Sequence, residues 1–178
     1  MFKHIYQYEL KYWLKKPATY IFALLFFSIP FIAIAGMAGE TADRFNGRVL
    51  NSAIYMYDLM RKVMYLLFFL LPVIIGQAVH RDFSANVHPI LNSYPITKRQ
   101  YIWAKFLSGF TVLTGIVSCS ALGFFLATQM PWTTPALLKH FEPLAYLQIF
   151  AGFLLPNLWL LSVLVFGVVL LSLSLIHI

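Results

Sequence analysis

Histidine and carboxylate side chains are the groups in this sequence that could bind a metal ion or transfer protons. The five histidines are scattered singly, and only His80 and His88 share a segment, with Asp82 between them. Imidazole and carboxylate are suitable zinc ligands, so a metal site can be imagined there. Histidines near a membrane surface that bind nothing are far commoner, and we therefore predict no metal site and no cofactor.

The sequence lacks the motifs of the common catalytic sites. It contains no Walker A glycine loop, no HExxH, no GxSxG and no dinucleotide-binding pattern. The single cysteine, Cys119, excludes an internal disulfide and a cysteine-based zinc site. No acidic residue lies inside a predicted span, which disfavours an ion-driven transporter. We predict that these residues catalyse no reaction and do not hydrolyse ATP.

The composition indicates an all-α integral membrane protein. Of the 178 residues, 61% are hydrophobic and only 11% are charged, whereas a soluble domain carries about 25% charge. The apolar runs approach the roughly 20 residues that a helix needs to cross the hydrocarbon core. Basic residues gather on the cytoplasmic side of membranes, so the net charge of +7 favours contact with a lipid bilayer over nucleic acid binding.

Residues 17–178 are predicted to form a transmembrane domain. About four helices are expected, at 19–37, 63–79, 106–128 and 146–171. The first, second and fourth contain an internal proline, which membrane helices tolerate because neighbouring groups satisfy the freed carbonyl. The third carries many glycine, serine and threonine residues, which favour close packing against other helices.

Residues 1–16 are predicted to form an amphipathic helix in the headgroup layer. Lys3 and Lys11 lie on its basic face, whereas Phe2 and Trp13 lie on its apolar face. Glu9 also projects onto the apolar face, where an unpaired carboxylate is costly. Two interpretations remain open: Glu9 pairs with Arg81 or Lys105 of the central segment, or it extends to water at the edge of the helix.

The central segment 80–105 is predicted to be a cytoplasmic loop. A short polar helix is expected at Phe83–Asn92, and Ser93–Pro95 should end it, because proline disfavours helix at the preceding residue. Thr97 is expected to cap the next helix. The simplest interpretation of the charges in this segment is a solvated loop, but its shape is also that of a docking element.

The distribution of Lys and Arg predicts that the N-terminus is cytoplasmic. Eight basic residues fall on one side of a four-span topology and five on the other. The first group is Lys3, Lys11, Lys15, Lys16, Arg81, Lys98, Arg99 and Lys105. The second group is Arg44, Arg48, Arg61, Lys62 and Lys139.

The order of these elements resembles the transmembrane subunit of ABC-2-type transporters. The resemblance is strongest in Arg81–Leu107, where the family has an acidic start, a short helix, a P-[VI]-[ST]-[KR] turn, an aromatic residue and a G-K pair. The matching positions are Asp82, Pro95-Ile96-Thr97-Lys98, Tyr101 and Lys105, with Ala104 in place of the usual glycine. Weaker matches resemble a bacterial branch whose larger members carry a C-terminal M1-type aminopeptidase domain. They are Phe2-Lys3, Tyr8-Glu9-Leu10, Lys16-Pro17, Tyr20, Met130-Pro131-Trp132, Tyr146-Leu147-Gln148 and Leu155-Pro156-Asn157.

The resemblance implies a function, a location and partners. Members of the family are half-transporters of about six spans in the inner (plasma) membrane, so the chain is expected to be an N-terminal fragment of an ATP-driven exporter. Its partners would be a separate ABC ATPase subunit and a second permease half. The ATPase contacts carried over are Arg81, Asp82, Phe83, Asn86, His88, Tyr94, Pro95, Lys98 and Arg99. The alternative is a membrane anchor for an M1-type peptidase that is missing from this chain.

Overall fold

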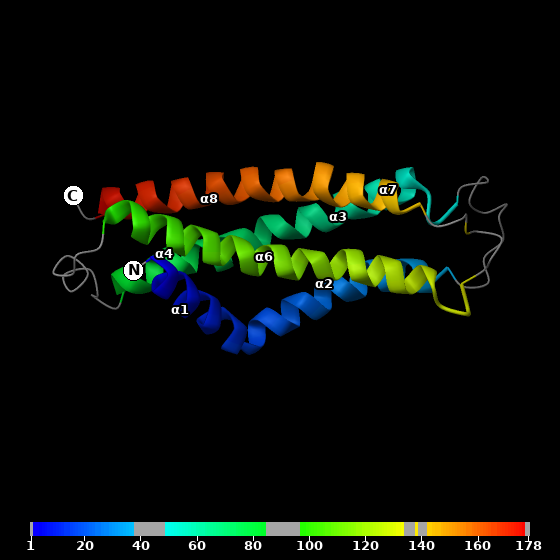
Figure 1. Cartoon of the computed structure of the whole chain (residues 1–178), viewed down its shortest axis with the longest axis horizontal. Helices are drawn as coiled ribbons and strands as arrows, with labels where there is room; N and C mark the ends of the chain where they lie inside the picture. Colours follow the sequence, from blue (N-terminus) through cyan, green and yellow to red (C-terminus); the bar gives the residue numbers. More distant parts are fainter. Residues whose placement is uncertain (1, 38–48, 85–96, 134–137, 139–141, 177–178) are drawn as a thin grey trace. The chain divides into compact units, whose positions relative to one another are not determined.

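The computed structural model describes the chain except for residues 1, 38–48, 85–96, 134–137, 139–141 and 177–178. The described residues form helices and contain no strand (Figure 1). The elements are α1 (Phe2–Lys15), α2 (Pro17–Ala35), α3 (Ala53–Leu71), η2 (Pro72–Gly76), α4 (Gln77–Ser84), α6 (Lys98–Thr128), α7 (Pro143–Leu147), η4 (Gln148–Leu154) and α8 (Leu155–Ile176).

Four helical segments among the described residues are long and apolar enough to cross a membrane. They are Pro17–Ala35, Ala53–Asp82, Lys98–Thr128 and Pro143–Ser172. The prediction of an all-α chain with about four helices able to span a membrane is therefore confirmed for the described residues. The last three segments contain 30 or 31 residues each, which is about 45 Å of helix and more than the hydrocarbon core requires.

The helices begin earlier along the chain than the predicted spans. The second helical segment already begins at Ala53, and α6 begins at Lys98. Thr97 caps α6 as predicted, because its Oγ1 accepts a hydrogen bond of 3.4 Å from the Gln100 backbone N–H. Phe83 and Ser84 end the helix that includes α4, so the beginning of the predicted surface helix is continuous with the second span. The remainder of that predicted helix lies outside the described residues.

Two of the internal prolines lie at wide π-helical turns. Pro72 begins η2, and η4 ends directly before α8, whose second residue is Pro156. A proline supplies no backbone N–H to the preceding turn, and such single-turn widenings accommodate the lost bond. Pro30, in contrast, lies inside the regular helix α2.

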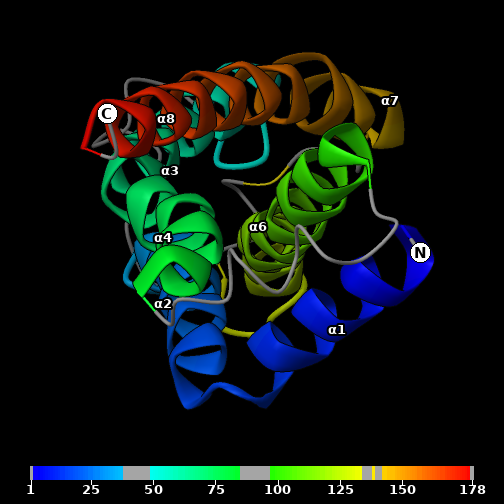
Figure 2. The ribbon, with the colours of Figure 1, turned by 90° about the vertical axis from the view of Figure 1, so that its left-hand side faces the viewer.

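The chain divides into two compact units. Unit 1 contains residues 1–19, 67–114 and 158–178, and unit 2 contains residues 20–66 and 115–157. Unit 1 therefore includes α1, η2, α4, the first half of α6 and most of α8; Figure 2 labels the helices among them. This unit brings α1 together with the two ends of the central segment, and the candidate site lies within it.

Close helix packing in unit 2 involves the small residues of α6. A Cβ placed on Gly123 would overlap the backbone carbonyl of Phe27 in α2, so only glycine permits this approach. Ser120 is fully buried, and its Oγ lies 3.6 Å from the Met60 sulfur of α3. The prediction that the small residues of this span pack against other helices is confirmed at these positions. Gly115 is different, since a Cβ there would meet nothing within 4 Å.

Candidate functional site

Four charged side chains from three helices meet in unit 1. We call Glu9 of α1, Arg81 and Asp82 of α4, and Lys105 of α6 the charged cluster. Arg81 Nη2 donates to Glu9 Oε1 at 2.5 Å. Lys105 Nζ lies 2.9 Å from Glu9 Oε1 and 2.6 Å from Asp82 Oδ2. Since two cations face two carboxylates, the charges of the cluster balance.

The cluster is largely shielded from solvent. Glu9 is 2% exposed and Lys105 only 1%, whereas Asp82 and Arg81 are 17% and 24% exposed. Charges at such positions require paired partners and further hydrogen bonds. Lys105 Nζ also donates to the Ala78 carbonyl at 2.7 Å. The burial therefore makes each member dependent on the others.

Tyrosines complete the cluster on two sides. The Tyr101 hydroxyl donates to Asp82 Oδ2 at 2.6 Å. On α1, the Arg81 guanidinium lies 4.0 Å from the centre of the Tyr12 ring, a distance that suits a cation–π interaction. Tyr12 and Tyr101 thus hold Arg81 and Asp82 in the orientations that face Glu9 and Lys105.

Lys16 extends these contacts towards the end of α1. Its Nζ lies 4.4 Å from the centre of the Tyr12 ring and 4.5 Å from that of Trp13. The same ammonium donates to Gln77 Oε1 at 2.7 Å. Hydrogen bonding by Lys16, supported by the nearby Arg81, lowers the pKa of Tyr12 against the opposing effect of partial burial. The hydrogen bond between Lys16 and Gln77 is a second link between the end of α1 and α4.

The spacing of these residues explains how single helices present them together. Glu9 and Trp13 lie four residues apart on one face of α1, and Lys16 follows Trp13 by three residues, directly after the end of the helix. Tyr101 and Lys105 are four apart in α6, and the adjacent Arg81 and Asp82 lie in the last turn of α4. Pro17 then begins α2, where Thr19 Oγ1 donates to the Trp13 carbonyl at 2.7 Å and anchors the turn.

This geometry decides between the two interpretations of Glu9. The carboxylate does not extend to water, and both predicted partners contact it at once, so the pairing prediction is confirmed. Trp13 is also buried, at 2% exposure. The face of α1 that holds Glu9 and Trp13 contacts the protein interior, because the carboxylate finds its counter-ions there.

The other residues predicted to contact a partner fall into two groups. Lys98 and Arg99 lie exposed in the first turn of α6, outside the charged cluster, as Phe2, Lys3 and Lys11 lie exposed on α1. Phe83 belongs to α4. Asn86, His88, Tyr94 and Pro95 lie outside the described residues. His88 was half of the imagined metal site, and no group of His, Cys, Asp and Glu suited to a metal occurs in the described parts of the chain.

Sequence reasoning missed Tyr12, Lys16, Gln77 and the bonding of Tyr101. A signal existed for two of them, because Tyr12 lies three residues after Glu9 and Tyr101 lies four before Lys105. Residues at these intervals share a helix face. Both carboxylates of the cluster are paired with cations, Glu9 with Arg81 and Lys105, and Asp82 with Lys105 and Arg81. The arrangement joins three helices through a neutral, buried network.

Comparison with known proteins gives no relative from which a role for this network can be taken. No family model, curated protein or solved structure matches the chain.

Proposed function

We propose that this chain is the membrane-spanning permease subunit of an ATP-driven exporter of the ABC-2 type. In this proposal the central segment 80–105 contacts a separate ABC ATPase subunit on the cytoplasmic side of the inner membrane. A second permease half completes the transport pathway, and the N-terminus is cytoplasmic. ATP is hydrolysed in the partner, since the chain has no nucleotide-binding motif.

The observation that carries the proposal is the ion pair between Asp82 and Lys105. These residues stand near the two ends of the central segment, and their side chains are 2.6 Å apart. Glu9 joins the same network through Arg81 and Lys105. A force applied to the central segment would therefore act on α1, α4 and α6 together. A network of this kind would carry movement of a docking element into the membrane helices.

The exposed cations Lys98 and Arg99 supply the surface for a partner. They lie in the first turn of α6, directly beside the end of the central segment. Exposed charge of one sign favours a partner surface of the other sign and sets specificity and association rate more than affinity. Arg81 serves a different purpose, because its guanidinium is occupied by Glu9 and Asp82.

The test is charge reversal at the exposed pair. Lys98→Glu with Arg99→Glu should abolish co-purification of the ATPase subunit while membrane insertion and helix content stay normal. The matched control is Arg61→Glu with Lys62→Glu, an adjacent exposed pair in α3 on the opposite side of the predicted topology. Normal co-purification of the Lys98/Arg99 variant would refute the docking role. Arg81 is a poor choice for this test, because its reversal would disrupt the charged cluster itself.

A further inference from the structure

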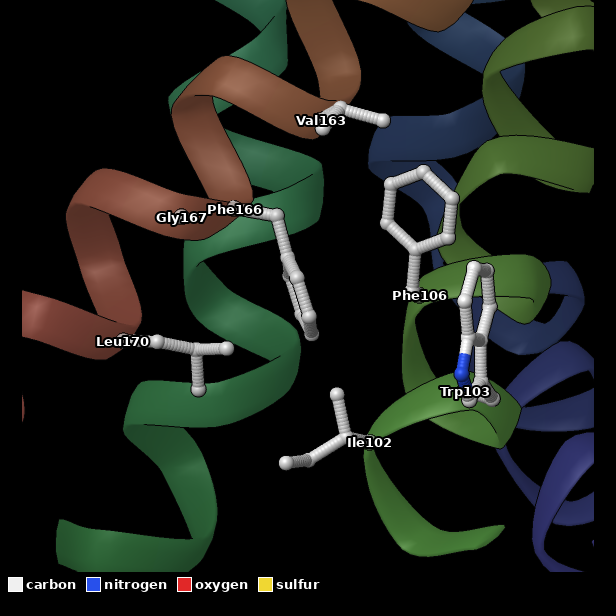
Figure 3. A pocket seen from close by; sticks show the side chains of 7 residues that line it. All are labelled: Ile102, Trp103, Phe106, Val163, Phe166, Gly167 and Leu170. Atoms are coloured by element: carbon white, nitrogen blue, oxygen red, sulfur yellow. The ribbon is translucent and has the colours of Figure 1, made fainter. Parts of the chain in front are cut away.

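Unit 1 contains an apolar groove between α6 and α8, with a volume of about 200 Å³. Figure 3 shows Ile102, Trp103 and Phe106 of α6 on one side and Val163, Phe166 and Leu170 of α8 on the other. Trp103 is 52% and Val163 45% exposed, so the groove opens onto the protein surface. Its lining is suited to a hydrocarbon.

The two walls have the regular spacing of helix faces. Residues 102, 103 and 106 form one face of α6, and residues 163, 166, 167 and 170 form one face of α8. Gly167 lies in the second wall, and a Cβ added there would meet nothing within 4 Å. The glycine therefore leaves space in the groove that a larger side chain would fill.

One end of the groove carries positive charge. Arg99 precedes Ile102 by three residues and Trp103 by four, so it continues the same face of α6 into the first turn. Arg99 and its neighbour Lys98 are both exposed. The helix N-terminus adds a partial positive charge. Trp103 lies one helical turn after Arg99, and tryptophan is enriched at the level of lipid headgroups.

We propose that this groove binds one acyl chain of an anionic phospholipid, with the headgroup phosphate held by Arg99 and Lys98. The apolar walls match the chain, the cations match the phosphate, and arginine is well suited to bidentate phosphate binding. The proposal rests on membrane insertion alone and not on the transporter function, and the lipid phosphate and the proposed ATPase contact are alternative occupants of Lys98 and Arg99. A zwitterionic lipid would satisfy the walls and also bring a phosphate, but its quaternary ammonium would offset that charge and be repelled by Arg99 and Lys98.

The experiment is native mass spectrometry of the delipidated full chain in detergent. Phosphatidylglycerol and phosphatidylcholine with identical acyl chains are titrated separately. We expect the first phosphatidylglycerol to bind roughly tenfold more tightly than phosphatidylcholine, because the choline ammonium offsets much of the attraction between the phosphate and the two cations. Arg99→Gln should remove that preference without altering the packing of the groove.

A second variant tests the groove itself. Gly167→Leu should weaken phosphatidylglycerol binding roughly tenfold, since it fills the space of the acyl chain. Gly115→Leu is the matched control, because Gly115 is also a helical glycine with open space around its Cβ position. Equal binding of the two lipids would overturn the proposal, as would unchanged binding by Gly167→Leu. Dimers of the chain that Gly167→Leu prevents, with no lipid bound, would assign the groove to a second copy instead.

Discussion

Glu9 and Lys105 form the most buried ion pair of the charged cluster, and removing either charge should destabilise the protein strongly. Their charged atoms are 2.9 Å apart, which at an effective dielectric constant of about 20 corresponds to roughly 6 kcal/mol of attraction. Desolvation offsets part of this attraction. Breaking a buried pair by removing one partner typically costs about 3–5 kcal/mol, because a charge is left uncompensated.

Glu9→Gln and Lys105→Met should lower the free energy of unfolding by different amounts within the range of about 3–5 kcal/mol. In Glu9→Gln, Lys105 keeps Asp82 at 2.6 Å and the Ala78 carbonyl at 2.7 Å, so we expect a loss of about 3 kcal/mol. In Lys105→Met, both carboxylates must share Arg81, so the expected loss is about 5 kcal/mol. The double variant restores charge balance through Arg81 and Asp82. Its loss should be about 2 kcal/mol less than the sum of the two single losses.

The assay is equilibrium unfolding in detergent micelles with increasing SDS, followed by circular dichroism. Asp58→Asn is the control, because Asp58 pairs with Arg61 and Lys62 on an exposed face, where ion pairs contribute little. Its unfolding midpoint should barely move. A loss of unfolding free energy below about 1 kcal/mol in either single variant would refute the account of a coupled buried network. A loss in the double variant that equals the sum of the two single losses within about 0.5 kcal/mol would refute it as well.

Three further predictions concern α1 and α6. Gly123→Ala should cost about 1–3 kcal/mol in the same unfolding assay, because its Cβ overlaps the Phe27 carbonyl, whereas Gly115→Ala should be neutral or stabilising; equal effects would contradict the close approach. Thr97→Ala should cost about 1 kcal/mol through loss of the α6 cap, and Thr97→Ser should retain most of that stability. The lowered pKa of Tyr12 predicts that its ionisation, followed at 295 nm as the difference between the wild type and Tyr12→Phe, occurs at a lower pH than that of a free tyrosine, and that Lys16→Gln moves it to higher pH. Because the pKa is lower in the folded state, ionisation of Tyr12 adds stability only as the pH rises towards the ordinary tyrosine value of about 10, and none at neutral pH.

The spans could be predicted from the sequence because hydropathy and length determine which segments can cross a bilayer. The buried carboxylate could also be predicted, since helical spacing places Glu9 on an otherwise apolar face and an ion there needs a partner. Arg81 and Lys105 were identified in this way as the basic residues that could pair with Glu9. Thr97 was recognisable as a cap from residue type and position alone.

Local patterns could not predict the joint geometry of the cluster. Lys105 contacts Glu9 and Asp82 at once because α1, α4 and α6 converge, and that convergence depends on tertiary packing. The inward orientation of Trp13 follows from the same packing, since an aromatic residue on an amphipathic helix fits a headgroup layer equally well. Pro72 leaves a backbone carbonyl of the preceding turn without its usual N–H donor. The widened turn depends on how that carbonyl is hydrogen-bonded instead, and the presence of a proline does not specify this.

The most direct test of the central claim is photo-crosslinking in intact membranes at Gln100. This exposed residue of the first turn of α6 lies beside Lys98 and Arg99, so a photoreactive amino acid there leaves both cations in place. We predict an adduct with a protein that mass spectrometry identifies as an ATPase with a Walker A motif, and no such adduct from the same amino acid at Lys62, which is exposed in α3. An ATPase adduct at Lys62 but not at Gln100, or no ATPase adduct at either position, would contradict the account.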